Sequence, residues 1–228
     1  ARKFYERAIV LDPDYAEAYA HLAQIHTMNG QFGWVDDNKR ADAIALELAR
    51  KSVLLDPALP FARWGLSRIL TRGSINQNDL AIKEMEKAIE LDANYADAYA
   101  FLGFLYTYSG RSERALPLLE RAMKTNPNFP FWYYHGLGQA QFFLGDYDAA
   151  AENMEKAVES NQTVYFTRLA LAATLAMMGR QDDAEWEIET LRVRGYDKTL
   201  AEFSAASPVH DKGYRKLFIE GLVKAGLK

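Results

Sequence analysis

Residues 96–129 read ADAYAFLGFLYTYSGRSERALPLLERAMKTNPNF, and this stretch decides the fold. Its first half carries apolar and small residues at helical spacing, namely Tyr99, Leu102, Gly103 and Tyr106. Its second half carries a second such set, namely Ala115, Leu119 and Ala122. Gly110 separates the two halves and Pro127 ends the second, because neither residue favours continuing a helix. The stretch predicts two helices joined by a short turn, with Gly103 at their close crossing.

The same pattern recurs along the chain. Five successive units place a small residue directly after a leucine, namely Ala23, Ser67, Gly103, Gly138 and Ala172. All five place an alanine early in the second helix, namely Ala45, Ala81, Ala115, Ala150 and Ala184. We predict repeats over residues 16–59, 60–95, 96–129, 131–164 and 165–198. A period near 34 residues predicts helix pairs that bury their apolar faces by stacking on their neighbours.

The flanking segments fit the same scheme. Residues 1–15 match the second helix of a repeat, with Pro13 at the corner. Residues 199–228 predict a C-terminal cap, with Asp211 capping a last helix that ends at Gly226. The unit 16–59 exceeds the period by about ten residues, in the stretch QFGWVDDNKRADAI, where an aspartate or Asn38 would cap the second helix. Phe32 and Trp34 fall in the loop before it; Trp34 is interpreted as a staple on its own repeat or as an exposed partner contact.

On these residues the chain resembles tetratricopeptide repeat (TPR) proteins over nearly all of its length. The resemblance implies an all-α, right-handed superhelical solenoid of antiparallel helix pairs, a single body over residues 1–228 with a C-terminal capping helix. It also implies a concave groove, lined by the first helices, that binds a protein or peptide. A narrower resemblance, carried by NPNFPFWYYHGLG and the ending GLVKAGLK, is to the repeat regions that follow bacterial class III nucleotide cyclase or winged-helix regulator domains. Under it, the chain is a regulatory region of a larger signalling protein.

The resemblance places a set of first-helix residues in the groove. They are Glu17, His21, Gln24, Phe61, Trp64, Arg68, Arg72, Phe101, Phe104, Tyr108, Trp132, His135, Gln139, Phe143, Phe166, Ala173 and Met177. Aromatic residues and arginine are enriched at binding hot spots, and arginine pairs with carboxylates. We therefore expect a ligand segment with apolar anchors and an acidic group near Arg68 and Arg72. The alternative for Phe101 and Phe104 is packing between adjacent helices.

A second function class is self-association. The first predicted helix carries Phe4 and Ile9 on a face that no predicted helix covers, and exposed apolar patches tend to find partners. This edge is the alternative interaction surface, for a second copy of the chain or for an upstream domain.

Composition narrows the remaining classes. The chain has 228 residues, a net charge of −4 and no cysteine, which excludes thiolate chemistry and gives no general argument for nucleic acid or membrane partners. His21 and His26 are five residues apart, so they do not share a helix face as a metal pair would. No nucleophile stands at recognisable spacing from a base. We expect a cytoplasmic or periplasmic binding protein with no catalytic residue, metal or cofactor.

Overall fold

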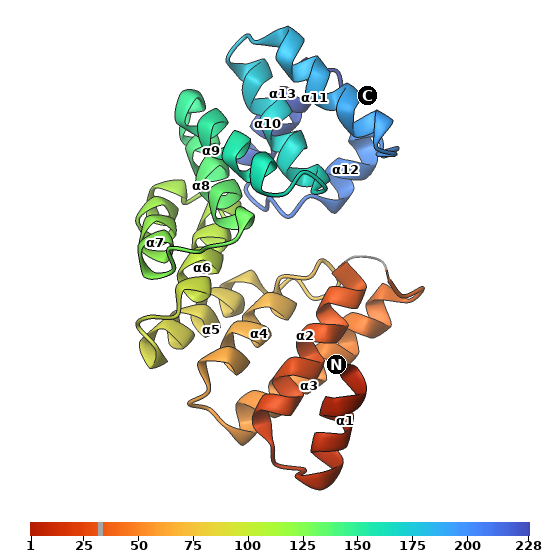
Figure 1. The fold of residues 1–228 in the computed structure, drawn as a ribbon, viewed down its shortest axis with the longest axis vertical. Coiled ribbons are helices and arrows are strands. Elements are labelled where there is room, and N and C mark those ends of the chain that lie inside the picture. The colour runs from red at the N-terminus through yellow and green to blue at the C-terminus, as the bar shows by residue number, and fades with distance from the viewer. Residues whose placement is uncertain (32–33) are drawn as a thin grey trace. The chain divides into compact units, whose positions relative to one another are not determined.

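The computed structural model describes residues 1–31 and 34–228, and all the regular secondary structure in these ranges is helical (Figure 1). The helices are α1 (Arg2–Leu11), α2 (Ala16–Gln31), α3 (Asn38–Leu55), α4 (Pro60–Leu70), α5 (Asn78–Leu91), α6 (Ala96–Tyr108), α7 (Ser112–Thr125), α8 (Phe131–Leu144), α9 (Tyr147–Ser160), α10 (Tyr165–Met177), α11 (Gln181–Val193), α12 (Leu200–Ala206) and α13 (Lys212–Lys224). The predicted all-α class is confirmed.

Local capping sets several helix boundaries. Asp37 caps α3, since its carboxylate accepts a hydrogen bond from the Arg40 backbone N–H at 2.9 Å. Asp211 caps α13 in the same way, accepting from the Tyr214 N–H at 2.8 Å. Each cap satisfies a backbone donor that has no partner within the helix. Asp211 was predicted as a cap from the sequence, and Asp37 was one of three candidates, with Asp36 and Asn38.

The chain divides into two compact units, Ala1–Ala98 (unit 1) and Tyr99–Lys228 (unit 2). The single solenoid body over residues 1–228 therefore stays a prediction. Phe32 lies outside the described residues. Trp34 keeps 66% of its surface exposed, so any staple on its own repeat covers a minor part of the ring.

In unit 1 the helices pack as successive pairs, α2 with α3 and α4 with α5, and α3 also packs against α4. Small hydroxyl residues tie the pairs together. The Ser52 hydroxyl donates to the Ala16 carbonyl at 2.7 Å, and the Ser67 hydroxyl donates to the Ala81 carbonyl at 2.7 Å. Ser67, the small residue after Leu66, thus allows α4 and α5 to come close enough for a direct bond between them.

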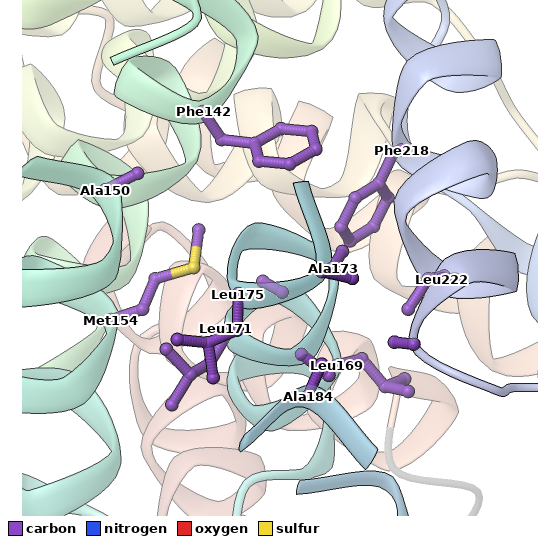
Figure 2. Packing of buried hydrophobic residues seen from close by; sticks show 14 of the residues in the cluster. Phe142, Ala150, Met154, Leu169, Leu171, Ala173, Leu175, Ala184, Phe218 and Leu222 are labelled. Carbon is purple, nitrogen blue, oxygen red and sulfur yellow. The ribbon is translucent and has the colours of Figure 1, made fainter. Parts of the chain in front are cut away.

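In unit 2 the core forms where α8, α9, α10 and α13 meet (Figure 2). Phe142, Met154, Leu169 and Leu222 are each fully buried there. In the same unit, a Cβ placed on Gly103 would lie 2.7 Å from Cγ of Leu119, so the predicted close crossing of the α6 and α7 helices is confirmed.

Candidate functional site

The clearest polar feature of the first helices in unit 1 is an arginine stacked on a tryptophan. α4 begins with Pro60, whose fixed φ suits the first turn of a helix, and places Trp64 and Arg68 one turn apart. The Arg68 guanidinium carbon lies 4.8 Å from the centre of the Trp64 ring. Trp64 is 7% exposed, whereas Arg68 is half-buried. The ring therefore forms a fixed floor under a charge that solvent reaches in part.

A row of aromatic rings leads to this pair. Consecutive ring centres are 4.6, 4.7, 5.6 and 6.3 Å apart, and the rings are those of Tyr5, His21, Phe61, Trp64 and Tyr95. All except Trp64 are partly accessible to solvent. His21, Phe61 and Trp64 belonged to the predicted groove set, whereas Tyr5 and Tyr95 did not.

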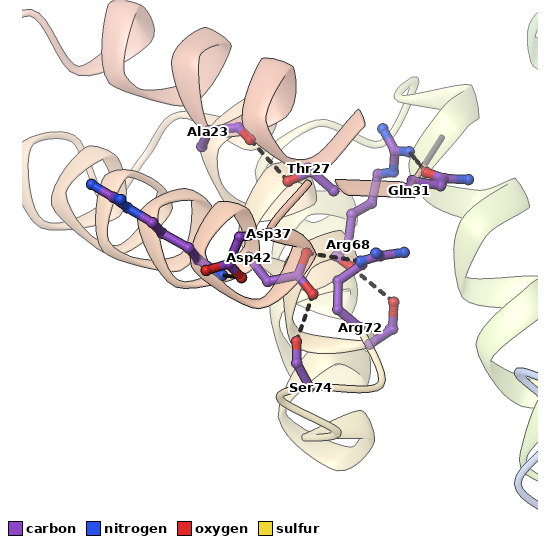
Figure 3. Close-up of polar contacts among 10 residues, drawn as sticks. Ala23, Thr27, Gln31, Asp37, Asp42, Arg68, Arg72 and Ser74 are labelled. Carbon is purple, nitrogen blue, oxygen red and sulfur yellow. Dashed lines mark hydrogen bonds and ion pairs between the residues drawn. The ribbon is translucent and has the colours of Figure 1, made fainter. Parts of the chain in front are cut away.

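Arg72 has a different environment from Arg68 (Figure 3). Its Nε lies 3.0 Å from Oδ1 of Asp42, and the Ser74 hydroxyl donates to Oδ2 of the same carboxylate at 2.5 Å. Asp42 is only 3% exposed. The charge of Arg72 is thus compensated within the chain, by a residue of the long second helix that the sequence analysis did not single out.

Arg68 has no such partner among the described residues. Its Nη2 donates to the neutral Oε1 of Gln31 at 3.3 Å (Figure 3), and no carboxylate of the described chain lies within 4.0 Å of it. Burial lowers the pKa of Arg68, and Tyr95 and Asp97 offset part of that effect. Within the described residues of unit 1, Arg68 therefore presents a half-buried guanidinium that forms no ion pair with a carboxylate.

The predicted residues of unit 2 form an aromatic cluster with a buried polar centre. Phe104 lies 5.8 Å from Tyr108, 6.0 Å from Trp132 and 5.9 Å from His135, measured between ring centres. Phe104 is 8% exposed and His135 is 4% exposed. Burial lowers the pKa of His135 to about 4, so its imidazole is neutral at physiological pH.

Packing accounts for most of this cluster. A Cβ on Gly136 would lie 2.8 Å from the Phe104 ring, so that ring is wedged against α8. Phe101 and Trp132 are half-buried, whereas Gln139 is 4% exposed. Oε1 of Gln139 and Nδ1 of His135 have no hydrogen-bond partner among the described residues. The structure thus places Phe104 between adjacent helices, which was the alternative to a ligand contact.

The C-terminal segment covers other positions expected in the groove. Ala173 is fully buried and meets Gly221 of α13, where an added Cβ would lie 2.9 Å from that of Ala173. The Phe143 ring stacks on Tyr214 at 4.4 Å, with 11° between the ring planes. The prediction that Phe143 and Ala173 face an open groove is therefore wrong. The sequence pattern gave α13 an apolar face but did not show where that face packs.

The N-terminal helix exposes more apolar surface than was predicted. Phe4 is 80% exposed and Ile9 is half-buried, while Val10 and Leu11 are 79% and 75% exposed. Tyr5 occupies the packed face and stacks on His21 of α2. Helical periodicity could have identified Val10 and Leu11 as exposed, because neither residue lies on the helix face that carries Tyr5.

No group of three or more His, Asp and Glu side chains suited to a metal ion occurs in residues 1–31 and 34–228. Within the same ranges, no helix combines the length and apolar character needed to cross a lipid bilayer.

The successive antiparallel helix pairs with small residues at each crossing define a helical repeat protein of the solenoid class. The tetratricopeptide repeat model matches residues 4–34, and a second model of the same description matches 70–95, 96–129 and 133–163. The chain belongs to the tetratricopeptide repeat family. Chains of this family are protein–protein interaction modules.

Several solved structures share the fold. MamA is 26% identical, with 71% of this chain and 81% of MamA covered and a TM-score of 0.51. PilF of Pseudomonas aeruginosa is 18% identical, with 91% and 88% covered and a TM-score of 0.65. YrrB, a TPR protein described as having an unusual peptide-binding site, is 18% identical, with 96% and 98% covered and a TM-score of 0.54. No curated protein matches the sequence.

Proposed function

We propose that this chain is a non-catalytic interaction module that binds a segment of a partner protein on the first helices of unit 1, with a ligand carboxylate at Arg68. The observation that carries the proposal is the unpaired guanidinium of Arg68, stacked on Trp64 and bonded within the described chain to a neutral amide alone.

The physical argument rests on charge and desolvation. A guanidinium partly removed from water loses hydration, and a carboxylate that accepts two of its N–H bonds restores that loss and adds charge attraction. Stacking on the Trp64 ring already restricts the Arg68 side chain, so less conformational entropy is lost when the ligand binds. Tryptophan, tyrosine and arginine are enriched among the few residues that dominate binding free energy at protein interfaces.

The aromatic row supplies the second half of the expected ligand. The partly exposed rings of Tyr5, Phe61 and Tyr95 offer apolar contact beside the charge. A matching segment carries apolar side chains next to an Asp, a Glu or a free C-terminus. That YrrB, which shares the fold, has a peptide-binding site supports this class of ligand. The set of lysines and asparagines found in repeat proteins that clamp acidic C-terminal tails is missing from the sequence, so we propose a different ligand.

The test is selection of peptides from a phage-displayed library of random 12-residue segments on the purified chain. Affinities of the selected peptides are then measured for the wild-type chain and for Arg68→Ala. We expect acidic residues to be enriched and affinity to fall at least tenfold in Arg68→Ala, which corresponds to about 1.4 kcal/mol. The matched control is Arg50→Ala, an exposed arginine of α3, which should leave affinity unchanged.

A peptide set without enriched acidic residues, or equal affinity in a folded Arg68→Ala chain, would remove Arg68 from the site. The same comparison made with the C-terminus of each peptide free and amidated shows whether the carboxylate is terminal or belongs to a side chain.

A second candidate function is self-association through α1, or docking of that helix to another part of a larger signalling protein. The exposure of Phe4, Val10 and Leu11 favours it.

A further inference from the structure

The segment that follows α12 crosses the first helices of unit 2 one after another. The backbone N–H groups of His210 and Asp211 both donate to the Tyr108 carbonyl at the end of α6, at 2.8 and 3.0 Å. Tyr214 then stacks on Phe143 of α8, and Gly221 meets Ala173 of α10. The segment thus contacts α6, α8 and α10 in that order.

This position differs from that of a further repeat. A first helix packs against the second helix that precedes it, as α4 does on α3 and α8 does on α7. α13 packs instead on α10 and α8, both of them first helices. Near its end it reaches α11 through side chains, since Gln181 donates to the Lys224 carbonyl at 2.8 Å and Arg192 donates to the Gly226 carbonyl at 3.1 Å.

The chemistry of α13 is that of an amphipathic ligand helix. Its inner face carries Tyr214, Phe218 and Leu222, each one turn from the next, and Figure 2 shows the last two directed at the core. Phe218 packs against Phe142 with ring centres 5.7 Å apart. Lys212, Lys216, Glu220 and Lys224 are exposed on the other face. Gly221 permits contact between the α13 and α10 backbones that no larger residue would allow.

We propose that the first helices of unit 2 form a helix-binding surface that α13 occupies within the same chain. A partner helix with aromatic residues at i and i+4, glycine at i+7 and leucine at i+8 competes with α13 for this surface. The inference extends the proposed function to the first helices of the other unit, and it requires neither Arg68 nor an acidic ligand.

The covalent link between α13 and the rest of the chain determines how tightly an external helix must bind to compete. A segment joined to its own binding surface acts at an effective concentration in the millimolar range, so an external helix must bind well enough to displace it. The surface is therefore closed to weak ligands and opens when α13 is released.

The experiment uses a fluorescein-labelled peptide of residues 207–228 and the full chain with Gly221→Val. A Cβ at position 221 would lie 2.9 Å from the Ala173 Cβ and 3.0 Å from the Ala173 carbonyl oxygen, so the valine prevents docking of α13 without altering the surface beneath it. By fluorescence anisotropy, we expect the Gly221→Val chain to bind the wild-type peptide at least tenfold more tightly than the wild-type chain does. The same peptide with Phe218→Ala and Leu222→Ala should not bind the Gly221→Val chain.

Hydrogen exchange identifies which part of the chain is released. In the Gly221→Val chain, we expect fast exchange of the α13 amides and retained protection of the α8 and α10 amides. If α13 is released, α8 and α10 stay protected and the peptide binds no more tightly, the proposal is wrong. If the wild-type chain instead forms a concentration-dependent dimer that the peptide dissociates, the surface binds a second copy of the chain. That result would overturn the proposal of a separate partner.

Asp211→Ala is the second variant, in case Gly221→Val does not fold. It removes the cap of α13 and leaves α8 and α10 untouched. It should raise peptide affinity about threefold to tenfold, and no change in affinity would contradict the proposal. Because Arg68 lies in unit 1, Arg68→Ala should leave peptide binding intact, which separates this test from that of the proposed function.

Discussion

At the scale of single residues, two arginines four positions apart illustrate how surroundings decide a role. Arg72 and Arg68 were equivalent in the sequence, as paired candidates for an acidic ligand. The structure gives Arg72 the buried carboxylate of Asp42 and gives Arg68 an aromatic floor and a neutral partner. Arg68 is therefore the residue on which the binding experiment is designed.

His135 makes folding sensitive to acid. Its folded-state pKa is about 4 because burial disfavours the charged form, while its ordinary value is 6.5. Between these values the unfolded chain binds a proton that the folded chain does not, so stability is complete above about pH 6.5 and falls as the pH drops toward 4. We expect urea unfolding to show a loss of about 2 kcal/mol from this residue between pH 7 and pH 5.

The matched variant is His135→Phe, which removes the titrating imidazole together with its unsatisfied Nδ1. Burial also lowers the pKa values of His26 and His210, so both chains share that background. The difference in unfolding free energy between wild type and variant should therefore change with pH. A constant difference from pH 7 to pH 5 would show that His135 titrates normally.

Alanine substitutions at two glycines should have opposite effects on the stability of the chain. Gly103→Ala places a Cβ 2.7 Å from Leu119, and overpacking of this kind costs about 1–3 kcal/mol. Gly65→Ala in α4 meets nothing within 4 Å, and should stabilise the chain by about 0.4–1 kcal/mol because alanine has less freedom when unfolded. Thermal unfolding of both variants gives the signs. A stabilised Gly103→Ala chain would contradict the close crossing of α6 and α7.

At the scale of helix pairs, α10 and α11 are joined by a buried ion pair. Nη1 of Arg168 lies 2.5 Å from Oε2 of Glu187, and both side chains are less than a tenth exposed. Burial raises the pKa of Glu187, while the bond to Arg168 opposes that shift. Because each buried charge loses hydration, such a pair adds little net stability, whereas removal of one partner alone is costly.

Arg168→Leu alone should cost about 3–5 kcal/mol, because it leaves a buried carboxylate without a partner. Arg168→Leu with Glu187→Leu should recover most of that loss, since apolar side chains of similar volume need no partner. Denaturant unfolding of the two variants makes the comparison. Equal losses in the single and double variants would mean that the cost is one of packing and not of charge.

At the scale of the whole molecule, the exposed apolar residues of α1 predict association. Phe4 and Val10 are each about four-fifths exposed. If this surface joins two copies, sedimentation should show a concentration-dependent dimer, and Phe4→Asp with Val10→Asp should return it to a monomer of unchanged helix content. The control is Val193→Asp, an equally exposed residue of α11. A chain that is monomeric at every concentration would exclude self-association through α1.

The sequence by itself determined the helices and their order. The recurring small residue after leucine, the alanine early in each second helix, and the caps at Asp37 and Asp211 are local signals, and local signals specify local structure. They also identified the close crossing at Gly103. The Asp42 partner of Arg72 lies 30 residues away in the chain, so no local pattern identified it.

Tertiary structure alone decided which predicted site residues are available. Phe104 and Ala173 carry the right spacing for a first-helix surface, yet one is wedged against α8 and the other lies under α13. Helical spacing reports which residues share a face, but not what packs on that face. That choice depends on contacts between distant segments, and here α13 made it by returning to the first helices instead of extending the row of repeats.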